Sequence, residues 1–428
     1  MNILIIGNGG REHAIAEALL KNKETERVYI STHNGGAHER IINAELPNND
    51  IASIDKFLAK TQIDLVIVGP ERFLSEGIID HLEAKGIKAF GPRKSAARLE
   101  SSKAFAKEFM EKYQIPTAKY LRYDNYMTAL SGLLEFGYPV VIKADGLCGG
   151  KGVSICQNEK EAVQALTDIF HNRIFGDQGA EIVMEQFLSG FEASLLCFVS
   201  GNKIYPFDTA MDYKKIYDND LGPNTGGVGC ISPNPYWTPD LDQQSNEIIR
   251  KIEQGLAEEN LGFTGILFIG YLVENGKLYV LEFNTRFGDP ETEVLLPRLK
   301  SDLLTNIMQA IEGKPVELDF ADNNVAMTTI LVSQGYPGKY ETGYEISGLD
   351  LVDPDILVYH NGTKQIIDAN SDPKVKVVTN GGRVLSVVAV KENLAAARQA
   401  VYTNIDKIHF DNMSYRMDIG KIIDNYKN

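Results

Sequence analysis

Short, wholly apolar runs alternate with amphipathic stretches over the first hundred residues, and this alternation limits the fold more than any other feature. A strand that is apolar along its whole length buries both faces, which is typical of a parallel sheet covered by helices on both sides. The strands expected on this basis are residues 2–6, 27–30, 64–68 and 87–90, with helices at 11–20 and 78–84. The chain is therefore expected to be α/β and to begin with a doubly wound parallel sheet.

A second α/β region is expected after one long helix at residues 94–112, which ends before Ile115-Pro116. Its strands are expected at 139–143, 152–156, 182–185 and 194–199, with a helix at 160–170. Residues 208–239 are rich in Gly, Pro, Asn and Asp. A long loop is expected there, and loops of this length are usually functional or disordered.

The rest of the chain is expected to form a hairpin and an α+β tail. A helix at 241–260 precedes strands at 265–273 and 277–283, which the turn Glu274-Asn275-Gly276 joins. The tail is expected to hold strands at 325–332, 356–360, 376–378 and 383–390, and a helix at 394–406.

The charge balance excludes several classes of partner. With 43 Lys and Arg against 58 Asp and Glu, the net charge is −15. Nucleic acids and anionic membranes need a basic face, so neither is an expected partner. No apolar run approaches the roughly 20 residues of a membrane helix, and the N-terminal run lacks the basic start of an export signal. The cysteines have no metal-ligand spacing and are expected to be reduced thiols in a cytoplasm: Cys148, Cys156, Cys197 and Cys230.

The first glycine-rich motif, Gly7-Asn8-Gly9-Gly10-Arg11-Glu12, lies between the first expected strand and helix. Glycines there allow a phosphate to approach the backbone at a helix N-terminus. A dinucleotide fingerprint is disfavoured because Glu12 occupies the third glycine position and no acidic residue ends the second strand. We therefore expect a phosphate or sugar-phosphate site, with a simple tight turn as the alternative.

A second glycine-rich loop, Asp145-Gly146-Leu147-Cys148-Gly149-Gly150-Lys151-Gly152, links two expected strands. Its spacing is not that of a Walker A loop. Backbone N–H groups in such a hairpin can bind a polyphosphate together with a lysine charge. Lys143 stands two residues before the loop, so a phosphate contact is favoured over a solvated strand end.

Glu282 and Asn284 lie two apart at the end of an expected strand, so their side chains share a face. A carboxylate with an amide oxygen suits Mg²⁺, although a solvated strand end is an equal alternative. The stretch Leu221-Gly222-Pro223-Asn224-Thr225-Gly226-Gly227-Val228-Gly229 contains hydrogen-bonding groups that a flexible linker does not need. A binding loop is therefore favoured there.

Taken in order, these motifs resemble the glycinamide ribonucleotide synthetase family of the ATP-grasp superfamily over nearly the whole chain. The family patterns G-x-G-G-R-E-H-A, V-G-P-E and S-K-x-F-x-K appear at residues 7–14, 68–71 and 102–107. The matches continue at 115–118, 141–147, 150–153, 185–194, 222–227, 282–291, 381–385 and 418–420.

The resemblance implies ATP as the nucleotide and Mg²⁺ as the metal, with replacement by Mn²⁺ left open, and it assigns Glu282 and Asn284 to the metal. The residues it assigns to ATP are Lys103, Lys143, Gly149, Gly150, Glu185, Gln186, Leu188 and Glu192. The residues it assigns to catalysis are Asp212, Arg286 and Lys151. Those assigned to the other substrates are Gly9, Gly10, Arg11, Glu12, Asn224, Thr225, Gly226 and Asp289.

The resemblance also implies an N-terminal α/β domain at 1–102, an ATP-grasp domain at 103–322 with a mobile lid at about 120–187, and a C-terminal α+β domain at 323–428. The implied reaction joins glycine to 5-phosphoribosylamine through glycyl phosphate, and it gives glycinamide ribonucleotide, ADP and phosphate in purine synthesis. A monomer or weak dimer in the cytoplasm is expected.

This chain departs from the family patterns in three places. It has Thr32-His33-Asn34-Gly35-Gly36-Ala37 for P-G-N-A-G-T, Ala210-Met211-Asp212-Tyr213-Lys214-Lys215 for A-Q-D-H-K-R, and Cys148-Gly149-Gly150-Lys151-Gly152 for A-A-G-K-G. Lysine in place of arginine loses a bidentate contact. Two alternatives therefore stay open: a divergent ATP-grasp ligase acting on another amine, and a non-enzymatic nucleotide sensor.

Overall fold

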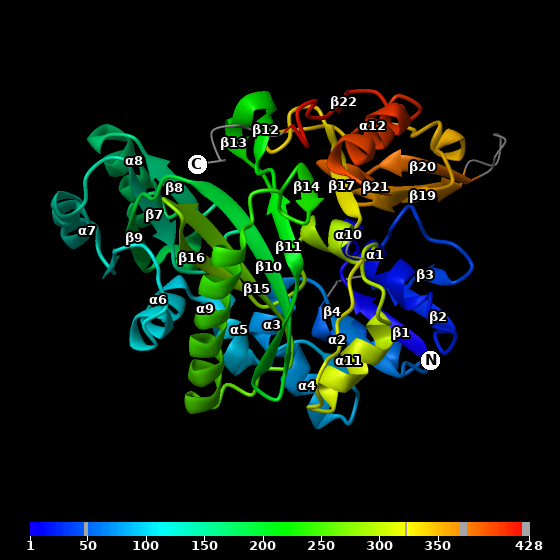
Figure 1. Cartoon of the computed structure of the whole chain (residues 1–428), viewed down its shortest axis with the longest axis horizontal. Helices are drawn as coiled ribbons and strands as arrows, with labels where there is room; N and C mark the ends of the chain where they lie inside the picture. Colours follow the sequence, from blue (N-terminus) through cyan, green and yellow to red (C-terminus); the bar gives the residue numbers. More distant parts are fainter. Residues whose placement is uncertain (47–49, 322, 368–374, 422–428) are drawn as a thin grey trace.

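The N-terminal sheet is parallel throughout, as its apolar strands predict (Figure 1). The computed structural model describes residues 1–46, 50–321, 323–367 and 375–421. Its first sheet has the order β3-β2-β1-β4-β5. The strands are β1 (Asn2–Ile6), β2 (Arg27–Ile30), β3 (Ile41–Asn43), β4 (Leu65–Val68) and β5 (Ala89–Phe90). The helices are α1 (Gly10–Leu19), α2 (Ile51–Leu58), α3 (Glu71–Glu76) and α4 (Ile78–Ala84).

This sheet has a topological switch point at β1, which pairs with β2 on one side and β4 on the other. Ligands of open α/β sheets usually bind at the carboxyl ends of strands at such a point. Ile3 to Ile6 are wholly buried, so both faces of β1 are covered, and the expected doubly wound sheet is confirmed.

The long helix expected at 94–112 is wrong in one respect, because it is broken at Ser102. The structure has α5 (Lys94–Ser101) and α6 (Lys103–Lys112). Ser102 adopts an extended conformation and its hydroxyl accepts a hydrogen bond from the Phe105 N–H. A serine in this role caps a helix start. The break turns the first residue of α6, Lys103, toward the glycine loop, where its Nζ lies 3.1 Å from the Gly146 carbonyl oxygen.

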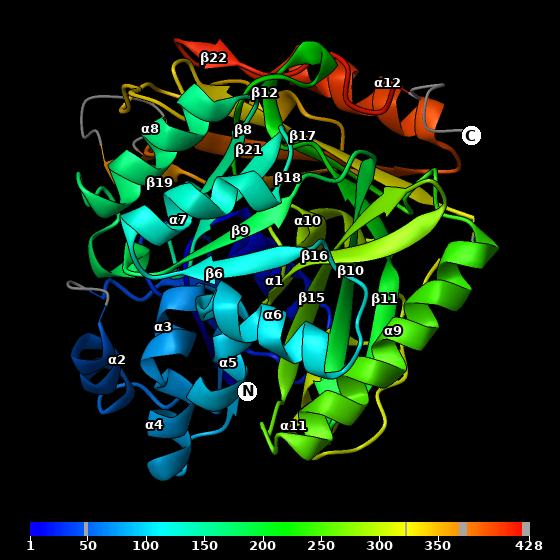
Figure 2. The same ribbon diagram turned by 90° about the vertical axis from the view of Figure 1, so that its left-hand side faces the viewer.

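A small antiparallel sheet stands apart at one end of the molecule (left in Figure 1, upper foreground in Figure 2). It has the order β6-β9-β7-β8. Its strands are β6 (Tyr120–Tyr123), β7 (Val140–Ala144), β8 (Val153–Cys156) and β9 (Ile182–Gln186), covered by α7 (Tyr126–Gly132) and α8 (Glu159–Phe170). The 3₁₀ turns η1 (Leu133–Glu135) and η2 (Gly176–Gly179) complete it. Its buried apolar side chains, from Ala129 to Met184, form a cluster of their own.

A large antiparallel sheet runs through the centre of the molecule in the order β16-β15-β10-β11-β14-β17-β21-β18, with β22 added beside β17. The strands that come from the middle of the chain are β10 (Phe191–Ser200), β11 (Lys203–Asp212), β14 (Gly229–Ser232), β15 (Gly265–Glu274) and β16 (Lys277–Asn284). Its C-terminal strands are β17 (Val325–Ser333), β18 (Ile356–His360), β21 (Arg383–Lys391) and β22 (Met413–Ser414). The pairing of β14 with β17 makes one sheet of both parts.

The long loop expected at 208–239 is wrong. The segment contains the end of β11, the hairpin of β12 (Lys215–Tyr217) and β13 (Leu221–Asn224), the turn η3 (Asp218–Asp220), and β14. Gly, Pro and Asn predict turns from composition, yet here short strands pair across them. Tertiary pairing therefore overrides local preference, as it often does for strands.

The remaining helices cover the large sheet. They are α9 (Pro239–Glu258), α10 (Glu291–Leu295), α11 (Leu303–Ile311) and α12 (Leu394–Ile405). A separate hairpin of β19 (Thr363–Ile367) and β20 (Val375–Thr379), and the turn η4 (Leu349–Leu351), complete the fold. Among the described residues, no helix is both long and apolar enough to cross a membrane.

Candidate active site

A cavity of about 350 Å³ collects side chains from α5, α6, the small sheet and the large sheet. Many of the residues predicted from sequence line it. They are Lys103, Lys143, Gly149, Gly150, Glu185, Gln186, Leu188, Glu192, Asp212, Asn224, Thr225, Gly226, Glu282, Asn284, Arg286 and Asp289. Residues nearly 200 positions apart in the chain thus meet at one place.

A buried carboxylate joins two lysines on one wall of the cavity. Glu185 on β9 lies 2.9 Å from the Nζ of Lys143 on β7 and 3.1 Å from the Nζ of Lys107 on α6. Because β7 and β9 are paired, the strand register places Lys143 and Glu185 close together. Breaking such a buried group by removing one partner leaves an uncompensated charge, which costs about 3–5 kcal/mol.

Lys107 on α6 is almost fully buried, and polar groups surround its amine. It is 2% exposed, and its Nζ donates a hydrogen bond of 2.6 Å to the Thr117 hydroxyl. Burial lowers its pKa to about 8, although Glu185 acts in the opposite direction. Lys107 therefore loses its proton more readily than an exposed lysine does.

Glu282 and Asn284 end β16 and both face the cavity. Burial alone would raise the pKa of Glu282, but Lys214, Lys143 and Lys103 hold it below its ordinary value. Its carboxylate is thus ionised at neutral pH. Among the described residues, no group of three or more His, Cys, Asp or Glu side chains could hold a metal. A cation at Glu282 would need further oxygen ligands from a bound molecule or water.

Arg286 lies beside these two residues between acidic side chains. Its guanidinium lies 3.2 Å from Glu100 and 3.7 Å from Glu71, and these two carboxylates raise its pKa despite the opposing effect of burial. Its Nε has no hydrogen-bond acceptor within the described part of the chain. The same Nε forms the 3.7 Å ion pair with Glu71, so an anionic oxygen that binds it would compete with that carboxylate.

Asp212 ends β11 in a half-buried position, with its Oδ1 shielded from solvent. Burial raises its pKa well above the ordinary range, and the neighbouring carboxylate of Glu291 adds to the effect. Its Oδ1 has no hydrogen-bond partner among the described residues. Glu291 itself accepts a 2.8 Å hydrogen bond from the Ser194 hydroxyl. A cationic amine placed at these two carboxylates would relieve their mutual repulsion.

The β12–β13 hairpin contributes both of its ends to the cavity. Lys214 precedes β12 and its Nζ lies 2.5 Å from Glu192. Thr225 follows β13 and bonds through its N–H and its hydroxyl to the Lys214 carbonyl, both at 2.8 Å. These contacts hold Asn224, Thr225 and Gly226 against the cavity.

The first glycine motif is not part of this cavity. The described residues that line the cavity do not include Gly9, Gly10, Arg11 or Glu12. Glu12 accepts the Gly9 N–H at 2.7 Å, and Asn361 accepts the Gly10 N–H at 2.9 Å. Arg11 pairs with Glu12 at 2.6 Å. A sugar phosphate at this helix start stays a prediction, and it requires Glu12 and Asn361 to release these N–H groups.

A substitution such as Gly10→Val could not test that prediction, because it would disturb the fold itself. A Cβ at Gly10 would lie 2.2 Å from Glu293 Oε1 and 2.3 Å from Asn361 Oδ1. The substitution would disrupt the packing of α1 against the C-terminal strands, whatever binds nearby. Gly9 is less crowded, since its nearest neighbour beyond Glu12 is Asp289, at 3.6 Å.

Lys151 is exposed, and it is not among the described residues that line the cavity. Gly149 and Gly150 have φ of +57° and +74°, in the region that favours glycine. The loop therefore keeps its backbone N–H groups close to the cavity while its lysine lies outside.

Several cavity residues had no predicted role. Glu71 and Lys107 stood inside motifs that were recognised for their pattern, and Lys214 stood inside a stretch noted for its departures. Glu291 also stood inside a recognised motif, at 282–291, without an assigned role. Glu100 gave no usable signal, because its proximity to Arg286 depends on the fold.

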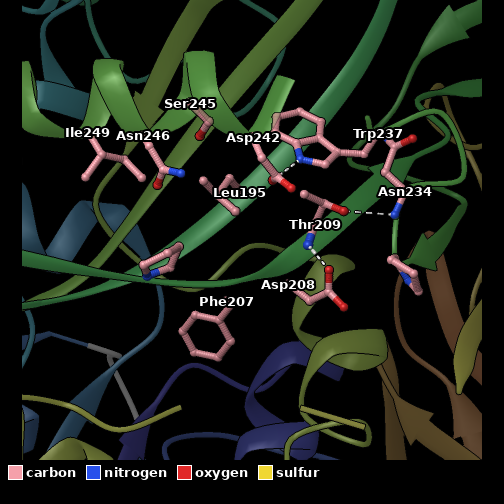
Figure 3. A pocket seen from close by; sticks show the side chains of 12 residues that line it. Leu195, Phe207, Asp208, Thr209, Asn234, Trp237, Asp242, Ser245, Asn246 and Ile249 are labelled. Atoms are coloured by element: carbon pink, nitrogen blue, oxygen red, sulfur yellow. Dashed lines mark hydrogen bonds between the residues drawn. The ribbon is translucent and has the colours of Figure 1, made fainter. Parts of the chain in front are cut away.

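A second cavity of about 290 Å³ lies between β11 and the start of α9 (Figure 3). Figure 3 shows the Trp237 indole N–H donating to Asp242, and the Asn234 N–H donating to the Thr209 hydroxyl. Its lining has Asp208 and Asp242 but, within the described residues, no lysine or arginine. This lining disfavours a nucleotide, so the first cavity is the candidate active site.

The chain also matches the domains of a known protein family. The three domains of phosphoribosylglycinamide synthetase match in order: the N domain over residues 1–100, the ATP-grasp (A) domain over 101–292 and the C domain over 326–422.

Individual relatives extend the likeness to whole chains. A phosphoribosylamine–glycine ligase of Listeria innocua is 42% identical over 422 residues, which is 98% of this chain and 99% of the relative. The crystal structure of the Thermotoga maritima phosphoribosylamine–glycine ligase is 30% identical with a TM-score of 0.84, and the match covers 98% of this chain and 100% of that one. The biotin carboxylase domain of Hydrogenobacter thermophilus 2-oxoglutarate carboxylase has a TM-score of 0.74 at 16% identity, with 99% and 94% covered, which is a likeness of fold alone.

The lowered pKa of Lys107 predicts a pH-dependent stability. The folded protein releases the Lys107 proton near pH 8, whereas the unfolded chain keeps it up to the ordinary lysine value. The unfolded state binds more protons in between, so stability rises with pH there. From pH 8 to pH 9.5, wild type should gain about 1–2 kcal/mol over Lys107→Met in urea unfolding.

The exposed Lys160 provides the matched control, since Lys160→Met should leave the difference from wild type flat over the same range. A difference between wild type and Lys107→Met that is equally flat would contradict the lowered pKa.

Proposed function

Because the chain belongs to the phosphoribosylglycinamide synthetase family, we propose that it joins glycine to 5-phosphoribosylamine, giving glycinamide ribonucleotide, ADP and phosphate. It is an ATP-dependent ligase of purine biosynthesis. The observation that carries the finer proposal is one cavity in which lysines, a carboxylate–amide pair and the acidic pair of Asp212 and Glu291 meet.

The proposed reaction has two steps. A glycine carboxylate oxygen attacks the γ-phosphorus of ATP, ADP leaves, and glycyl phosphate forms. The amine nitrogen of phosphoribosylamine then attacks the acyl carbon, phosphate leaves, and the nitrogen gives up a proton. Such chemistry asks the protein mainly for positioning and charge neutralisation.

Nucleotide binding is assigned to the wall built from α6 and the small sheet. Lys103 and Lys143 would face the phosphates, and the backbone N–H groups of Gly149 and Gly150 would assist them. Residues 185–188 would meet the adenine. Glu192 would meet the ribose, and it would then share its carboxylate with Lys214, which it now contacts at 2.5 Å.

Members of the ATP-grasp superfamily use ATP with divalent metal ions. Glu282 and Asn284 fit this need, because an ionised carboxylate and an amide oxygen at one cavity wall are the hard oxygen donors that Mg²⁺ prefers. A bound Mg²⁺, or Mn²⁺ in its place, would neutralise phosphate charge there. This chain's own residues would hold and orient the polyphosphate through Lys103 and Lys143.

The catalytic roles follow from donors and acceptors left without partners. The Arg286 Nε would bind an oxygen of the phosphate that is transferred to glycine. Asp212 and Glu291 would bind the amine nitrogen and accept its proton. The glycine loop above them would exclude the water that hydrolyses acyl phosphates.

Several predictions from the sequence enter this proposal unchanged. We keep the domain limits of 1–102, 103–322 and 323–428, although residues 322 and 422–428 lie outside the described residues. We also keep the cytoplasmic location and the monomer or weak dimer. The substrates are small molecules.

An assay of ADP release with a panel of amino acids and phosphorylated sugar amines tests the proposal. Release of more than one equivalent of ADP per enzyme should require both glycine and phosphoribosylamine. Release with a different amine would favour the divergent ligase instead, and a dependence on bicarbonate would favour a carboxylase. Tight ATP binding without any ADP release would favour the nucleotide sensor.

Glu282→Gln should nearly abolish turnover and leave the fold intact. The variant removes the one carboxylate surrounded by Lys103, Lys143 and Lys214, so the metal and the phosphates lose their shared anchor. Turnover below about a tenth of wild type at saturating Mg²⁺ is expected, since direct metal ligands matter more than their neighbours. Glu258→Gln on α9 is the control. Activity above that level, with an unchanged circular dichroism spectrum, would remove Glu282 from the site.

The region 120–187 should close over ATP as a unit, because its apolar core is its own. The N–H groups of Gly146 and Leu147 bond to Gln178, but the glycines at 149 and 150 have no side chain to anchor the rest of the loop when it is empty, so the amides at 148–150 should exchange quickly. Hydrogen exchange at 146–152 should slow on adding ATP, while exchange in α12 stays constant. Equal exchange of the loop with and without nucleotide would contradict closure.

A further inference from the structure

The β12–β13 hairpin is held by the C-terminal part of the chain, far away in sequence. Figures 1 and 2 show it between α8 of the small sheet and α12. Its two ends carry Lys214 and Asn224, which line the cavity. Within the part of the chain that the structure describes, β12 and β13 pair only with each other. Something else must therefore fix its position.

The tip of the hairpin is bound by three successive residues near the C-terminus. Asn219 donates its N–H to Asp418 at 2.8 Å, and Met417 donates its N–H to Asp218 at 2.8 Å. Arg416 donates to Asp220, also at 2.8 Å. The tip needs this support, because Asn219 and Asp220 have φ of +59° and +52°, which non-glycine residues seldom adopt.

Arg416 is the centre of this contact. It is 2% exposed, and it binds Asp418 through Nε and Nη2, both at 2.7 Å. Its Nη1 also donates to the Lys215 carbonyl at 2.9 Å, and its guanidinium lies 5.2 Å from the centre of the Tyr213 ring. One planar fork thus joins the tail, the tip and the first strand of the hairpin, which a lysine could not do.

The other end of the hairpin has a separate support. Arg383 donates to the Gly226 carbonyl at 2.6 Å and pairs with Asp289 at 2.8 Å. Asp289 lines the cavity, so Arg383 is next to the site itself. Arg416, in contrast, is absent from the cavity wall that the described residues form. Its effect on the site must pass through the hairpin.

We propose that Arg416 is a positioning residue that sets the place of Lys214 and Asn224–Gly226 in the cavity. The proposal rests on the proposed function only in naming glycine and phosphoribosylamine as the molecules that this wall meets. The C-terminal tail thereby takes part in substrate binding without touching a substrate.

Arg416→Gln and Arg416→Lys test the proposal in the full-length protein. Arg416→Gln should raise the KM of glycine or of phosphoribosylamine about tenfold, because small displacements at a reacting site are costly. The KM of ATP should rise by less, since Lys214 reaches the proposed ATP site only through Glu192. Arg416→Lys keeps the charge and loses the fork, so it should fall between Arg416→Gln and wild type.

Arg298→Gln is the matched control. Arg298 is similarly buried and pairs with Asp208 at 2.7 Å, but its partners among the described residues lie outside the hairpin. Its loss should lower stability to a similar degree and leave each KM unchanged. A common rise in KM for both variants would mean that Arg416 acts only through general stability, and would overturn the proposal.

Hydrogen exchange of the substrate-free protein separates this proposal from the proposed function. Arg416→Gln should speed exchange at 215–226 at least tenfold relative to Arg298→Gln, with β10 and β15 unchanged. The exchange measurement needs no substrate, so it tests the contact between the tail and the hairpin even if the ligase assay shows no activity. Unchanged exchange in the hairpin, or faster exchange without any change in KM, would overturn the positioning role.

Discussion

The ion group of Glu185 with Lys107 and Lys143 is the interaction on which the cavity depends. A protein with a net charge of −15 has to keep cations in a partly buried place if it is to bind a polyphosphate. Burying lysines alone would be costly, and a carboxylate shared between them offsets that cost. The same balance recurs at Glu282, whose pKa the surrounding lysines lower, and at Arg286, which lies between Glu71 and Glu100. In the cavity, acidic and basic side chains therefore lie beside each other and offset each other's charge. Each proposed role depends on this balance.

Much of the fold could be predicted from the sequence, for physical reasons that also explain the errors. The strand at Asn2–Ile6 was recognisable because both of its faces are buried, which leaves no polar residue in the run. The hairpin near 277–284 was recognisable from its turn. The break at Ser102 was missed because a serine inside a helical pattern becomes a cap only when the neighbouring helix turns away. β14 was missed because its partner β17 lies about a hundred residues away. β12 and β13 pair with each other, and they were missed because their Gly, Pro and Asn residues favour a loop.

The site shows the same division. Lys143, Glu282 and Asn284 could be predicted because strand geometry and ligand chemistry are local, and the family resemblance added the adenine-side residues. Glu100 could not, since nothing near it in sequence indicates that Arg286 will lie beside it. Glu291 stood inside the motif at 282–291, but its proximity to Asp212 depends on the fold. The helix start at Gly10 was interpreted as an open anion site, yet its N–H already donates to Asn361 in the turn after β18, 351 residues away. A local motif can provide N–H groups that bind an anion, but the tertiary structure determines whether another part of the chain already bonds to those groups.

The small sheet with α7 and α8 has an apolar core to which the rest of the chain contributes nothing within the described residues. Such a part can melt while the remainder stays folded, because its stability comes from contacts inside its own boundary. Its local unfolding equilibrium would then compete directly with nucleotide capture. Substitutions that loosen this core would first appear as weaker affinity for ATP, and only later as a loss of intact protein. Temperature would act in the same order, so the working range of the enzyme is set by its least stable part and not by the large sheet.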